Sequence, residues 1–334
     1  TLGKLGISLG SVVLDLKQMM QSKSDIVDTL TGGIDFLFKK SKITRLEGSA
    51  TITGAGSVTI VDGRDKGDYK AGKIMIATGS HPSSLPGITI DEKHIVSSTG
   101  ALSLKTLPKK MVVIGAGYIG LELGTVWARL GAEVEIIEFL PRILPGMDAE
   151  IAKKFMTIAK KQGLKFRLST AVKSAKAGKN GVSLTVTPAN GGVEETIKAD
   201  IALVSVGRHP ATDGLGLEKI GVTMTPRGRI AVDAHFETSI EDIYAIGDVI
   251  DGPMLAHKAE EDAVAAVEMM TGKPGHVDYD VVPGIVYTAP EIATLGKSEE
   301  ELTEAGVEFA KGVFPFSANS RARAQGHSDG FVKI

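Results

Sequence analysis

The sequence contains no cysteine, a single tryptophan and no long apolar run. Without a thiol, these 334 residues cannot perform thiol–disulfide exchange and cannot form a thiolate metal site. Few aromatic residues and a net charge of −2 give no reason to expect nucleic acid or an acidic membrane surface as a partner. No stretch approaches the roughly 18 consecutive apolar residues that a membrane-spanning helix needs. We therefore predict no nucleic-acid partner, no membrane span and no metal site.

The first ten residues also lack an initiator methionine and the charged-then-apolar layout of a secretion signal. We expect Thr1 to be a cut end within a longer protein. The composition is otherwise ordinary for a globular protein, with 43% hydrophobic and 23% charged residues. A chain of this length can form two or three domains, each with its own core.

Helical spacing of apolar residues over Asp15–Lys40 predicts a long helix with one buried stripe. The stripe consists of Leu16, Met19, Met20, Ile26, Val27, Leu30, Ile34, Leu37 and Phe38. Short β-type runs follow at Ile43–Leu46, Ala50–Ile52, Val58–Val61 and Lys73–Ala77. The segment Pro82–Pro108 is rich in Pro, Gly and Ser, which indicates a connection between domains.

A second run of elements begins at Met111. We predict strands at Met111–Ile114, Glu133–Glu138, Val182–Val186, Val193–Ile197, Ile201–Val206, Ile285–Thr288 and Glu291–Leu295, and an extended Val313–Phe316. Asn190-Gly191 is a hairpin turn signal. We predict helices at Tyr118–Leu130, after a cap at Asp148, and at Ala256–Met270 and Glu299–Ala305.

The sharpest local motif is the Gly-x-Gly-x-x-Gly pattern formed by Gly115, Gly117 and Gly120 between a strand and a helix. In a Rossmann crossover the first glycine permits a tight turn, the second lets a pyrophosphate approach, and the third lets the helix pack against the strand. The helix N-terminus directs N–H groups at the phosphates. A glycine-rich turn without a ligand is the alternative interpretation.

Glu138 ends the next strand, 18 residues after Gly120. An acid at this position is expected to bond the ribose hydroxyls and to repel a 2′-phosphate, which favours NAD over NADP. Arg142 lies close by and weakens that preference.

Two further segments suggest a second nucleotide. One is the strand Ile76–Ser80, which ends in Thr78-Gly79-Ser80, and the other is Thr238–Asp248, which ends in Gly247-Asp248. Each alone is more often an ordinary turn. Their order around the fingerprint resembles that of the two-dinucleotide flavoprotein disulfide reductases, in which an NAD(P) domain is inserted into an FAD domain.

Within that family the chain resembles the dihydrolipoamide dehydrogenase branch along its whole length. The resemblance rests on Glu138–Leu140, Pro145–Asp148, Val206–Pro210, Gly252–Glu260, Val286–Glu291 and Phe314–Ala322. It implies an α/β fold with two Rossmann-like domains and the start of an α+β interface domain. The implied boundaries are 1–107 and 232–281 for the FAD domain, 108–231 for the NAD domain and 282–334 for the interface domain.

The resemblance also implies cofactor contacts. The implied NAD-binding residues are Gly115, Ala116, Gly117, Tyr118, Ile119, Gly120, Leu121, Glu122, Glu138, Val172 and Gly207. The implied FAD-binding residues are Gly48, Ala50, Thr78, Gly79, Ser80, Asp248, Met254, Leu255, Ala256 and His257. Asp248 would bond the ribityl chain. Tyr118 and Glu122 would form the hydride-transfer pocket where nicotinamide meets flavin, although Tyr118 could simply cover the pocket edge and His257 could be a core histidine.

The sequence departs from the family in three ways. The N-terminal FAD fingerprint, the redox Cys-x4-Cys pair and the C-terminal His-Glu acid–base pair are all absent. The simplest interpretation is an interior portion of the protein, which retains hydride transfer and lacks the thiol half, so that no catalytic residue of that half is present.

The implied activity is oxidation of protein-bound dihydrolipoamide, with FAD and NAD as cofactors. The implied partners are a second copy in a homodimer and the lipoyl domains of 2-oxoacid dehydrogenase complexes, in the mitochondrial matrix or the bacterial cytoplasm. A thiol-free reductase of a quinone or an iron–sulfur protein, and a non-enzymatic interaction protein, stay open as alternatives.

Overall fold

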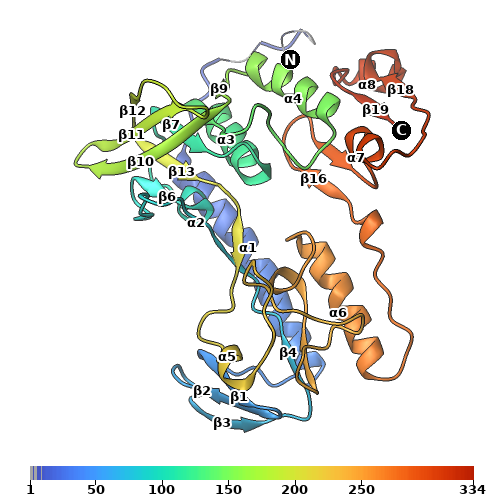
Figure 1. The fold of residues 1–334 in the computed structure, drawn as a ribbon. Coiled ribbons are helices and arrows are strands. Elements are labelled where there is room, and N and C mark those ends of the chain that lie inside the picture. Colours follow the sequence, from blue (N-terminus) through green and yellow to red (C-terminus); the bar gives the residue numbers. More distant parts are fainter. Residues whose placement is uncertain (1–2, 4–5, 9) are drawn as a thin grey trace. The chain divides into compact units, whose positions relative to one another are not determined.

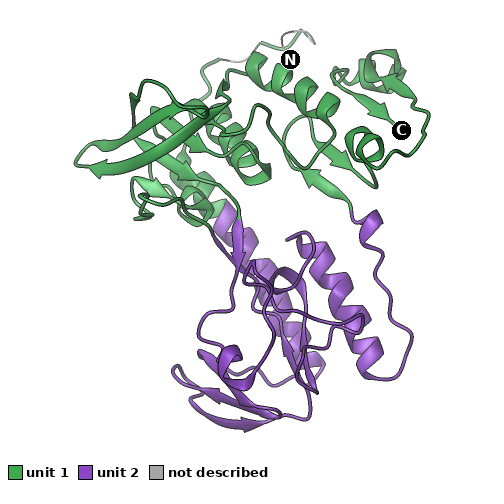
Figure 2. Cartoon of the chain, in the orientation of Figure 1, with its two compact units in different colours: residues 1–22, 83–207, 283–334 green, residues 23–82, 208–282 purple. Residues whose placement is uncertain are grey.

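The structure is a computed structural model that describes residues 3, 6–8 and 10–334. It is an α/β chain that divides into two compact units (Figure 2). Unit 1 comprises residues 1–22, 83–207 and 283–334, and unit 2 comprises residues 23–82 and 208–282. The division means that each unit is built from segments far apart in the sequence.

The centre of unit 1 is a five-stranded parallel sheet in the order β6-β13-β7-β8-β9 (Figure 1). Its strands are β6 (Ile95–Val96), β7 (Lys110–Ile114), β8 (Glu133–Ile137), β9 (Lys165–Arg167) and β13 (Ile201–Val204). Side chains alternate between the two faces of a strand. On β7, Met111 and Val113 therefore join one core and Val112 and Ile114 join the other.

Helices cover one face of this sheet and an antiparallel sheet covers the other. The helical side holds Leu121 and Trp127 of α3 (Tyr118–Leu130) and Phe155 of α4 (Ala149–Lys161). The opposite core includes Val182 and Leu184 of a three-stranded antiparallel sheet. That sheet is formed by β10 (Thr170–Gly178), β11 (Gly181–Pro188) and β12 (Glu195–Ala199). Both faces of the parallel sheet are buried, which explains the continuous apolar runs of β7 and β13.

The carboxyl-terminal segment of unit 1 packs beside α3 and α4. It contains β16 (Gly284–Val286), β17 (Ile292–Thr294), α7 (Glu299–Glu304), β18 (Val313–Pro315), η4 (Phe316–Ala318), α8 (Ser320–Ala324) and β19 (Phe331–Lys333). A further helix of the unit, α2 (Ser98–Ala101), lies earlier in the chain. Lys333 places its ammonium 2.9 Å from Asp148 and 3.2 Å from Glu150, and it also pairs with Glu299. Asp148 is buried and is the N-cap of α4, so Lys333 links β19 to the start of that helix.

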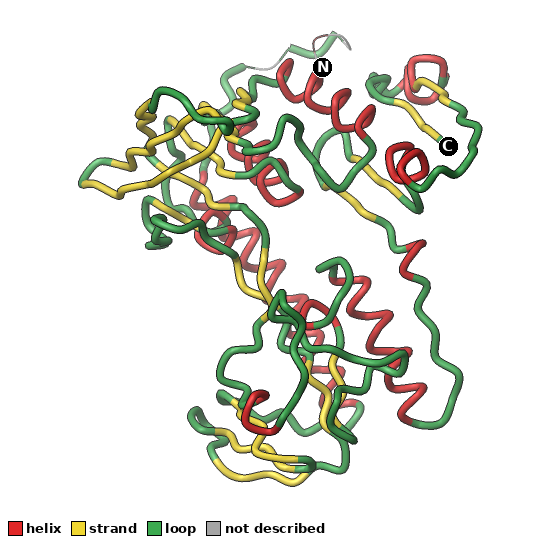
Figure 3. Tube along the Cα trace, in the orientation of Figure 1, coloured by secondary structure: helices red, strands yellow, loops and turns green. Residues whose placement is uncertain are grey.

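Unit 2 is built around the parallel pair β4 (Ile74–Ile76) and β15 (Ile243–Ala245). Ile76, Ile243, Ala245 and Ala266 contribute to its core. The other elements are β1 (Ala50–Gly54), β2 (Ser57–Ile60), β3 (Gly67–Lys70), β5 (Ser80–Pro82), β14 (Arg208–Pro210), α5 (Leu217–Ile220), η2 (Gly247–Val249), α6 (Ala256–Met270) and η3 (Tyr279–Val281). The strands of this unit contain only three to five residues each and are drawn as short yellow segments in Figure 3.

The predicted long helix is present as α1 (Leu16–Lys40), but its predicted buried stripe is wrong. None of its residues is buried, and Ile26, Leu30 and Ile34 are all more than half exposed. Periodicity identifies a face that is able to be buried, whereas burial also requires a neighbour against that face. The Asp15 carboxylate accepts the Gln18 N–H at 2.9 Å, which explains why the helix begins where it does.

The strand predicted at Ile43–Leu46 is also wrong, because these residues form no regular structure. A β-type run becomes a strand only where a partner strand is available. The helices predicted at Tyr118–Leu130 and Ala256–Met270 are confirmed residue for residue, and Gly131 ends the first in the left-handed conformation. The sequence interpretation missed β10, the longest strand of the hairpin sheet.

The predicted domain boundaries differ from the boundaries of the two compact units. Residues 208–231, which we assigned to the NAD domain, lie in unit 2, and residues 83–107, which we assigned to the FAD domain, lie in unit 1. The chain passes between the units at 22/23, 82/83, 207/208 and 282/283, and β5 pairs with β14 beside the second and third of these crossings. The assignment of these domains to particular cofactors remains a prediction. Among the described residues no helix is long and apolar enough to cross a membrane.

Candidate nucleotide-binding site

The fingerprint turn between β7 and α3 has the geometry that its glycines predict. Gly115 has a φ of +103°, and a Cβ there would lie 2.4 Å from the Ser205 carbonyl oxygen. A Cβ at Gly120 would lie 2.1 Å from the Gly115 carbonyl oxygen. A Cβ at Gly117 would have no heavy atom within 4 Å. Two of the glycines are therefore required by the fold, whereas Gly117 leaves open space at the helix N-terminus for a ligand.

Glu138 lies at the carboxyl end of β8, beside this turn. Its two carboxylate oxygens accept the Ala116 N–H at 2.7 Å and the Leu140 N–H at 2.8 Å. Two backbone donors hold the carboxylate in one orientation, and its side chain is almost fully buried. The acid predicted to bond a ribose is thus positioned by the fingerprint loop itself.

A cavity of about 720 Å³ opens at this end of the parallel sheet. It joins parts of unit 1 that are distant in sequence: the glycine turn, the end of β8, the start of β10 and the segment after β13. Five of the predicted NAD residues line it, namely Gly115, Gly117, Glu138, Val172 and Gly207. Ligands of open α/β sheets bind at the carboxyl ends of the strands, and the cavity lies there. The arrangement fits an extended dinucleotide.

The other predicted NAD residues do not line the cavity. Ala116, Gly120 and Leu121 are buried behind the turn, and Ile119 is half-buried in the first turn of α3. They shape the loop and the helix rather than its open surface. Their direct contact with NAD remains a prediction.

Tyr118 and Glu122, predicted to form the hydride-transfer pocket, face the carboxyl-terminal segment of unit 1. A Cβ at Gly284 would lie 3.0 Å from the Tyr118 hydroxyl oxygen, and Glu122 accepts the Tyr287 N–H at 2.8 Å. Burial raises the pKa of Tyr118, so its hydroxyl keeps its proton at neutral pH. Both side chains therefore connect α3 to β16 and the residue after it, and their role in hydride transfer remains a prediction.

Sequence reasoning missed Ser205, and it considered Arg142 only for its effect on the preference for NAD over NADP. The Ser205 hydroxyl donates to the carbonyl oxygens of Ile114 at 3.0 Å and Gly115 at 3.2 Å, which fixes the fingerprint turn. Its position directly after a buried parallel strand was an available signal. Arg142 donates to the carbonyl oxygens of Leu144 and Met147, so in this structure it is engaged by its own loop.

In unit 2 the structure brings together two of the predicted FAD residues. The Ser80 hydroxyl donates to the Asp248 carboxylate. Arg208 donates to the Ser80 hydroxyl at 2.7 Å and to the Ser80 carbonyl oxygen at 2.6 Å. A hydroxyl has one proton, so Arg208 as a donor to Ser80 leaves that proton for Asp248. Ser80 therefore orients Asp248, the residue predicted to bond the ribityl chain, and Arg208 orients Ser80.

A buried network holds the loop that contains Asp248. Lys258 donates to the Gly247 carbonyl oxygen at 3.1 Å, and Asp262 accepts the Gly247 N–H at 2.9 Å. The Tyr279 hydroxyl donates to Asp262 at 2.7 Å. Burial and this carboxylate both raise the pKa of Tyr279. Sequence reasoning missed this network, although Lys258 and Asp262 stand four residues apart on a predicted helix.

The remaining predicted FAD residues lie in three places. Thr78 donates to the Ala211 carbonyl oxygen at 2.7 Å, and Gly79 accepts the Ala211 N–H at 2.9 Å. Gly48 adjoins a turn held by Asp62, which accepts the Ser49 N–H at 2.8 Å, and β1 begins at Ala50. The stretch predicted to line the flavin lies at the start of α6 and comprises Met254, Leu255, Ala256 and His257. The contacts of all these residues with FAD remain predictions.

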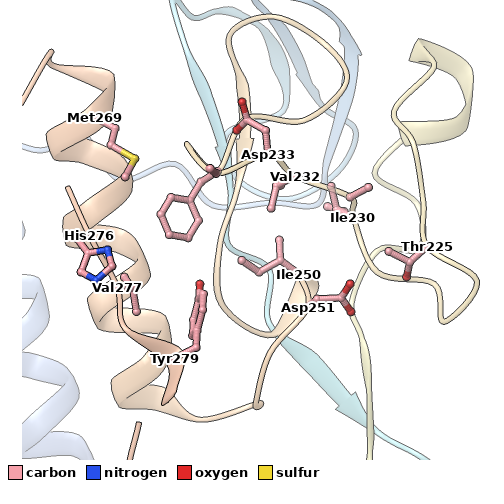
Figure 4. Close-up of a pocket in the computed structure, with 13 residues that line it drawn as sticks. Thr225, Ile230, Val232, Asp233, Ile250, Asp251, Met269, His276, Val277 and Tyr279 are labelled. Carbon is pink, nitrogen blue, oxygen red and sulfur yellow. The ribbon is translucent and has the colours of Figure 1, made fainter. Parts of the chain in front are cut away.

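A second cavity, of about 470 Å³, lies in unit 2 (Figure 4). It lies beside Met269 on α6, with His276 and Tyr279 on the segment that follows the helix and Val232 and Ile250 on nearby loops. None of the predicted FAD or NAD residues lines it. Among the described residues there is also no cluster of three or more His, Cys, Asp or Glu that could hold a metal ion.

Comparison with known protein families matches residues 5–263 to the model for pyridine nucleotide-disulphide oxidoreductases. Residues 282–334 match the dimerisation domain of the same group. The chain belongs to the pyridine nucleotide-disulphide oxidoreductase family. The α/β architecture and the predicted cofactor pair, FAD and NAD, are those of this family.

The resemblance to dihydrolipoamide dehydrogenases is confirmed. The chain is 54% identical over 330 residues to the mitochondrial dihydrolipoyl dehydrogenase of Pisum sativum, covering 98% of the chain and 66% of that protein. The corresponding human protein is 52% identical over 334 residues, covering 98% and 65%. A leghemoglobin reductase of Glycine max is 54% identical, covering 98% and 63%. The chain therefore spans just under two thirds of the length of these relatives.

Solved structures give the same family. LpdA from Mycobacterium tuberculosis superposes with a TM-score of 0.87 at 25% identity, covering 97% of this chain and 72% of that one. The HOCl-induced flavoprotein disulfide reductase RclA of Escherichia coli superposes with a TM-score of 0.84 at 26% identity, covering 96% and 72%.

Proposed function

We propose that this chain is the NAD-binding portion and part of the FAD-binding portion of a dihydrolipoyl dehydrogenase. The whole protein would oxidise protein-bound dihydrolipoamide and reduce NAD⁺ to NADH. The observation that carries the proposal is the cavity in unit 1, where Gly117, Glu138 and Gly207 line one space. The 54% identity to a dihydrolipoyl dehydrogenase supports the choice of substrate.

In the proposed function, bound FAD and NAD supply the redox chemistry, and the residues of this chain hold and orient them. The open N-terminus of α3 at Gly117 would receive the pyrophosphate, because its free N–H groups favour an anion. Glu138 would accept hydrogen bonds from the adenosine ribose. Asp248, oriented by Ser80 and Arg208, would accept a hydrogen bond from the ribityl chain.

The proposal extends to partners and location. The match of residues 282–334 to a dimerisation domain supports a homodimer. Lipoyl domains of 2-oxoacid dehydrogenase complexes would be the source of the dithiol. The mitochondrial names of the plant and human relatives support the mitochondrion, and we propose the matrix as the compartment.

The ribose assignment is tested by Glu138→Gln in the whole protein that contains this chain. Glutamine has one acceptor oxygen where the carboxylate has two, so it cannot hold Ala116, Leu140 and a ribose together. We expect NADH affinity, measured by quenching of flavin or protein fluorescence, to fall at least tenfold while flavin content stays unchanged. Glu133→Gln is the matched control, because Glu133 is an exposed acid on the same strand, paired with Lys165. Unchanged NADH affinity in Glu138→Gln would refute the assignment.

The substrate is tested separately. Turnover of dihydrolipoamide with NAD⁺ by the whole protein supports the proposed function. Reduction of a quinone or an iron–sulfur protein without turnover of dihydrolipoamide would overturn it in favour of the thiol-free reductase.

A further inference from the structure

Two histidines face one another on the short ribbon formed by β5 and β14. The strands are antiparallel, and His81 is directly opposite His209 in their register. The two ring centroids are 5.8 Å apart with the planes tilted by 53°. Both side chains are exposed. None of the roles proposed above uses either residue.

We propose that His81 and His209 form a two-imidazole binding site for a divalent transition-metal ion of the Cu²⁺, Ni²⁺ and Zn²⁺ class. Imidazole nitrogen lies about 2.0–2.1 Å from such ions, so two rings on one tetrahedral ion have centres roughly 5–6 Å apart. The observed spacing therefore allows both rings to bind one ion after small side-chain rotations. Exposure leaves the remaining coordination positions to water.

The ribbon fixes the distance between the two ligands. Arg208, the first residue of β14, donates to both the hydroxyl and the carbonyl oxygen of Ser80 on β5. Alternate residues of a strand point to opposite faces, so Ser80 and Arg208 lie on one face of the ribbon and the histidines on the other. A preorganised pair of ligands loses less conformational freedom on binding than two independent side chains would.

The chemistry of the ligands selects the ion. Neutral imidazole suits Cu²⁺, Ni²⁺ and Zn²⁺, whereas Mg²⁺ and Ca²⁺ prefer oxygen ligands. Cu²⁺ should bind most tightly, following the usual order of stability for these ions. A bound ion would crosslink residues 80–82 to residues 208–210, beside two of the four points where the chain passes between its units.

The test is calorimetric titration of the whole, tag-free protein with Zn²⁺ and Cu²⁺ at pH 7.5, after alkylation of any thiols. We expect one ion per chain at this site, and at least a tenfold loss of affinity for it in His81→Gln, His209→Gln and the double variant. His235→Gln is the control, because His235 is an exposed histidine of the same unit that lies near Asp233. It should bind as the unchanged protein does.

Two further measurements separate ligation from a general effect on folding. The electron paramagnetic resonance spectrum of bound Cu²⁺ should show nitrogen couplings from two imidazoles, and these should be lost in the double variant. Affinity should fall as the pH drops from 7.5 to 5.5, because protons compete with the metal ion for the imidazole nitrogens. Equal affinity in His81→Gln, or an equal loss in His235→Gln, would overturn the proposal.

Discussion

The ammonium group of Lys258 lies 2.7 Å from the carboxylate of Asp262, and both side chains are fully buried on α6. The pair holds both backbone groups of Gly247, the residue before the predicted ribityl ligand Asp248. A buried ion pair contributes little net stability when it is complete, but removal of one partner leaves an uncompensated charge. The pair therefore makes the position of the Asp248 loop dependent on α6.

Loss of either partner of this pair should destabilise unit 2. We expect Lys258→Met or Asp262→Asn to lower the free energy of unfolding by about 3–5 kcal/mol, and the double variant to lose less than the sum of the two. Tyr279→Phe removes one hydrogen bond to the same carboxylate and should cost about 1–3 kcal/mol. Urea unfolding of the whole protein measures these changes, and simple additivity of the two charge variants would contradict a coupled pair.

The chain of contacts from Arg208 through Ser80 to Asp248 should control flavin retention. Arg208→Met leaves the Ser80 hydroxyl free to rotate, so Asp248 loses its fixed orientation. We expect the FAD dissociation constant, measured by recovery of flavin fluorescence during dialysis, to rise at least fivefold in Arg208→Met and in Ser80→Ala. Arg64→Met, which changes an exposed arginine of the same unit, should leave FAD affinity unchanged. The double variant with Arg208→Met and Ser80→Ala should lose no more FAD affinity than either single variant, because Arg208 acts on Asp248 only through Ser80.

Alanine at Gly117 and alanine at Gly120 should have different effects, the first on NADH affinity and the second on stability. A Cβ at Gly120 would lie 2.1 Å from the Gly115 carbonyl oxygen, so Gly120→Ala should destabilise unit 1. Gly117 has a φ of −80° and open space around its Cβ position, so Gly117→Ala should fold normally and lose NADH affinity at least tenfold. Thermal unfolding and NADH titration distinguish the two effects. A Gly117→Ala protein that binds NADH normally would place the pyrophosphate elsewhere.

The link between Lys333 and the cap of α4 predicts a pH dependence. Burial opposes ionisation of Asp148, but the Lys333 ammonium and the N–H groups of Ile151 and Glu150 outweigh it and lower the pKa of Asp148. A lowered pKa means that its stabilising contribution is present above the unfolded value of about 3.9 and is lost as the pH falls through the folded value.

Asp148→Asn tests this contribution, because asparagine caps a helix as well as aspartate does but cannot pair with an ammonium. At pH 7 we expect the variant to be less stable by about 1.5–3 kcal/mol, the typical strength of a hydrogen bond to a charged group. The difference should shrink below about pH 4 as the native carboxylate is protonated. A difference that is constant from pH 7 to pH 2 would show that the ion pair with Lys333 is not responsible for it.

Much of the candidate nucleotide-binding site in unit 1 could be predicted from the sequence, because its signals are local. Gly115, Gly117 and Gly120 specify a turn within six residues, and Gly131 ends the same helix through its own backbone conformation. Glu138 follows at a spacing that one strand and one helix determine. The cavity then unites these residues, because parallel strands end at one edge of a sheet.

The errors arose where long-range packing decides the outcome. The apolar stripe of α1 has the period of a buried helix face, yet no residue of the helix is buried. The run Ile43–Leu46 has β propensity but forms no strand. Propensity describes what a segment is able to form, whereas burial and strand pairing require a second segment.

The sequence by itself determined the family, the fingerprint turn and the acid that follows it, since each depends on residues that are close along the chain. Only the tertiary structure decided that Arg208 orients Ser80, that Lys258 and Asp262 hold Gly247, and that His81 faces His209. The members of the first and third pairs are 128 residues apart, and the lysine–aspartate pair acts on a loop beyond its own helix. Such contacts are set by the pairing of strands and the packing of a helix on a loop, which no local pattern encodes.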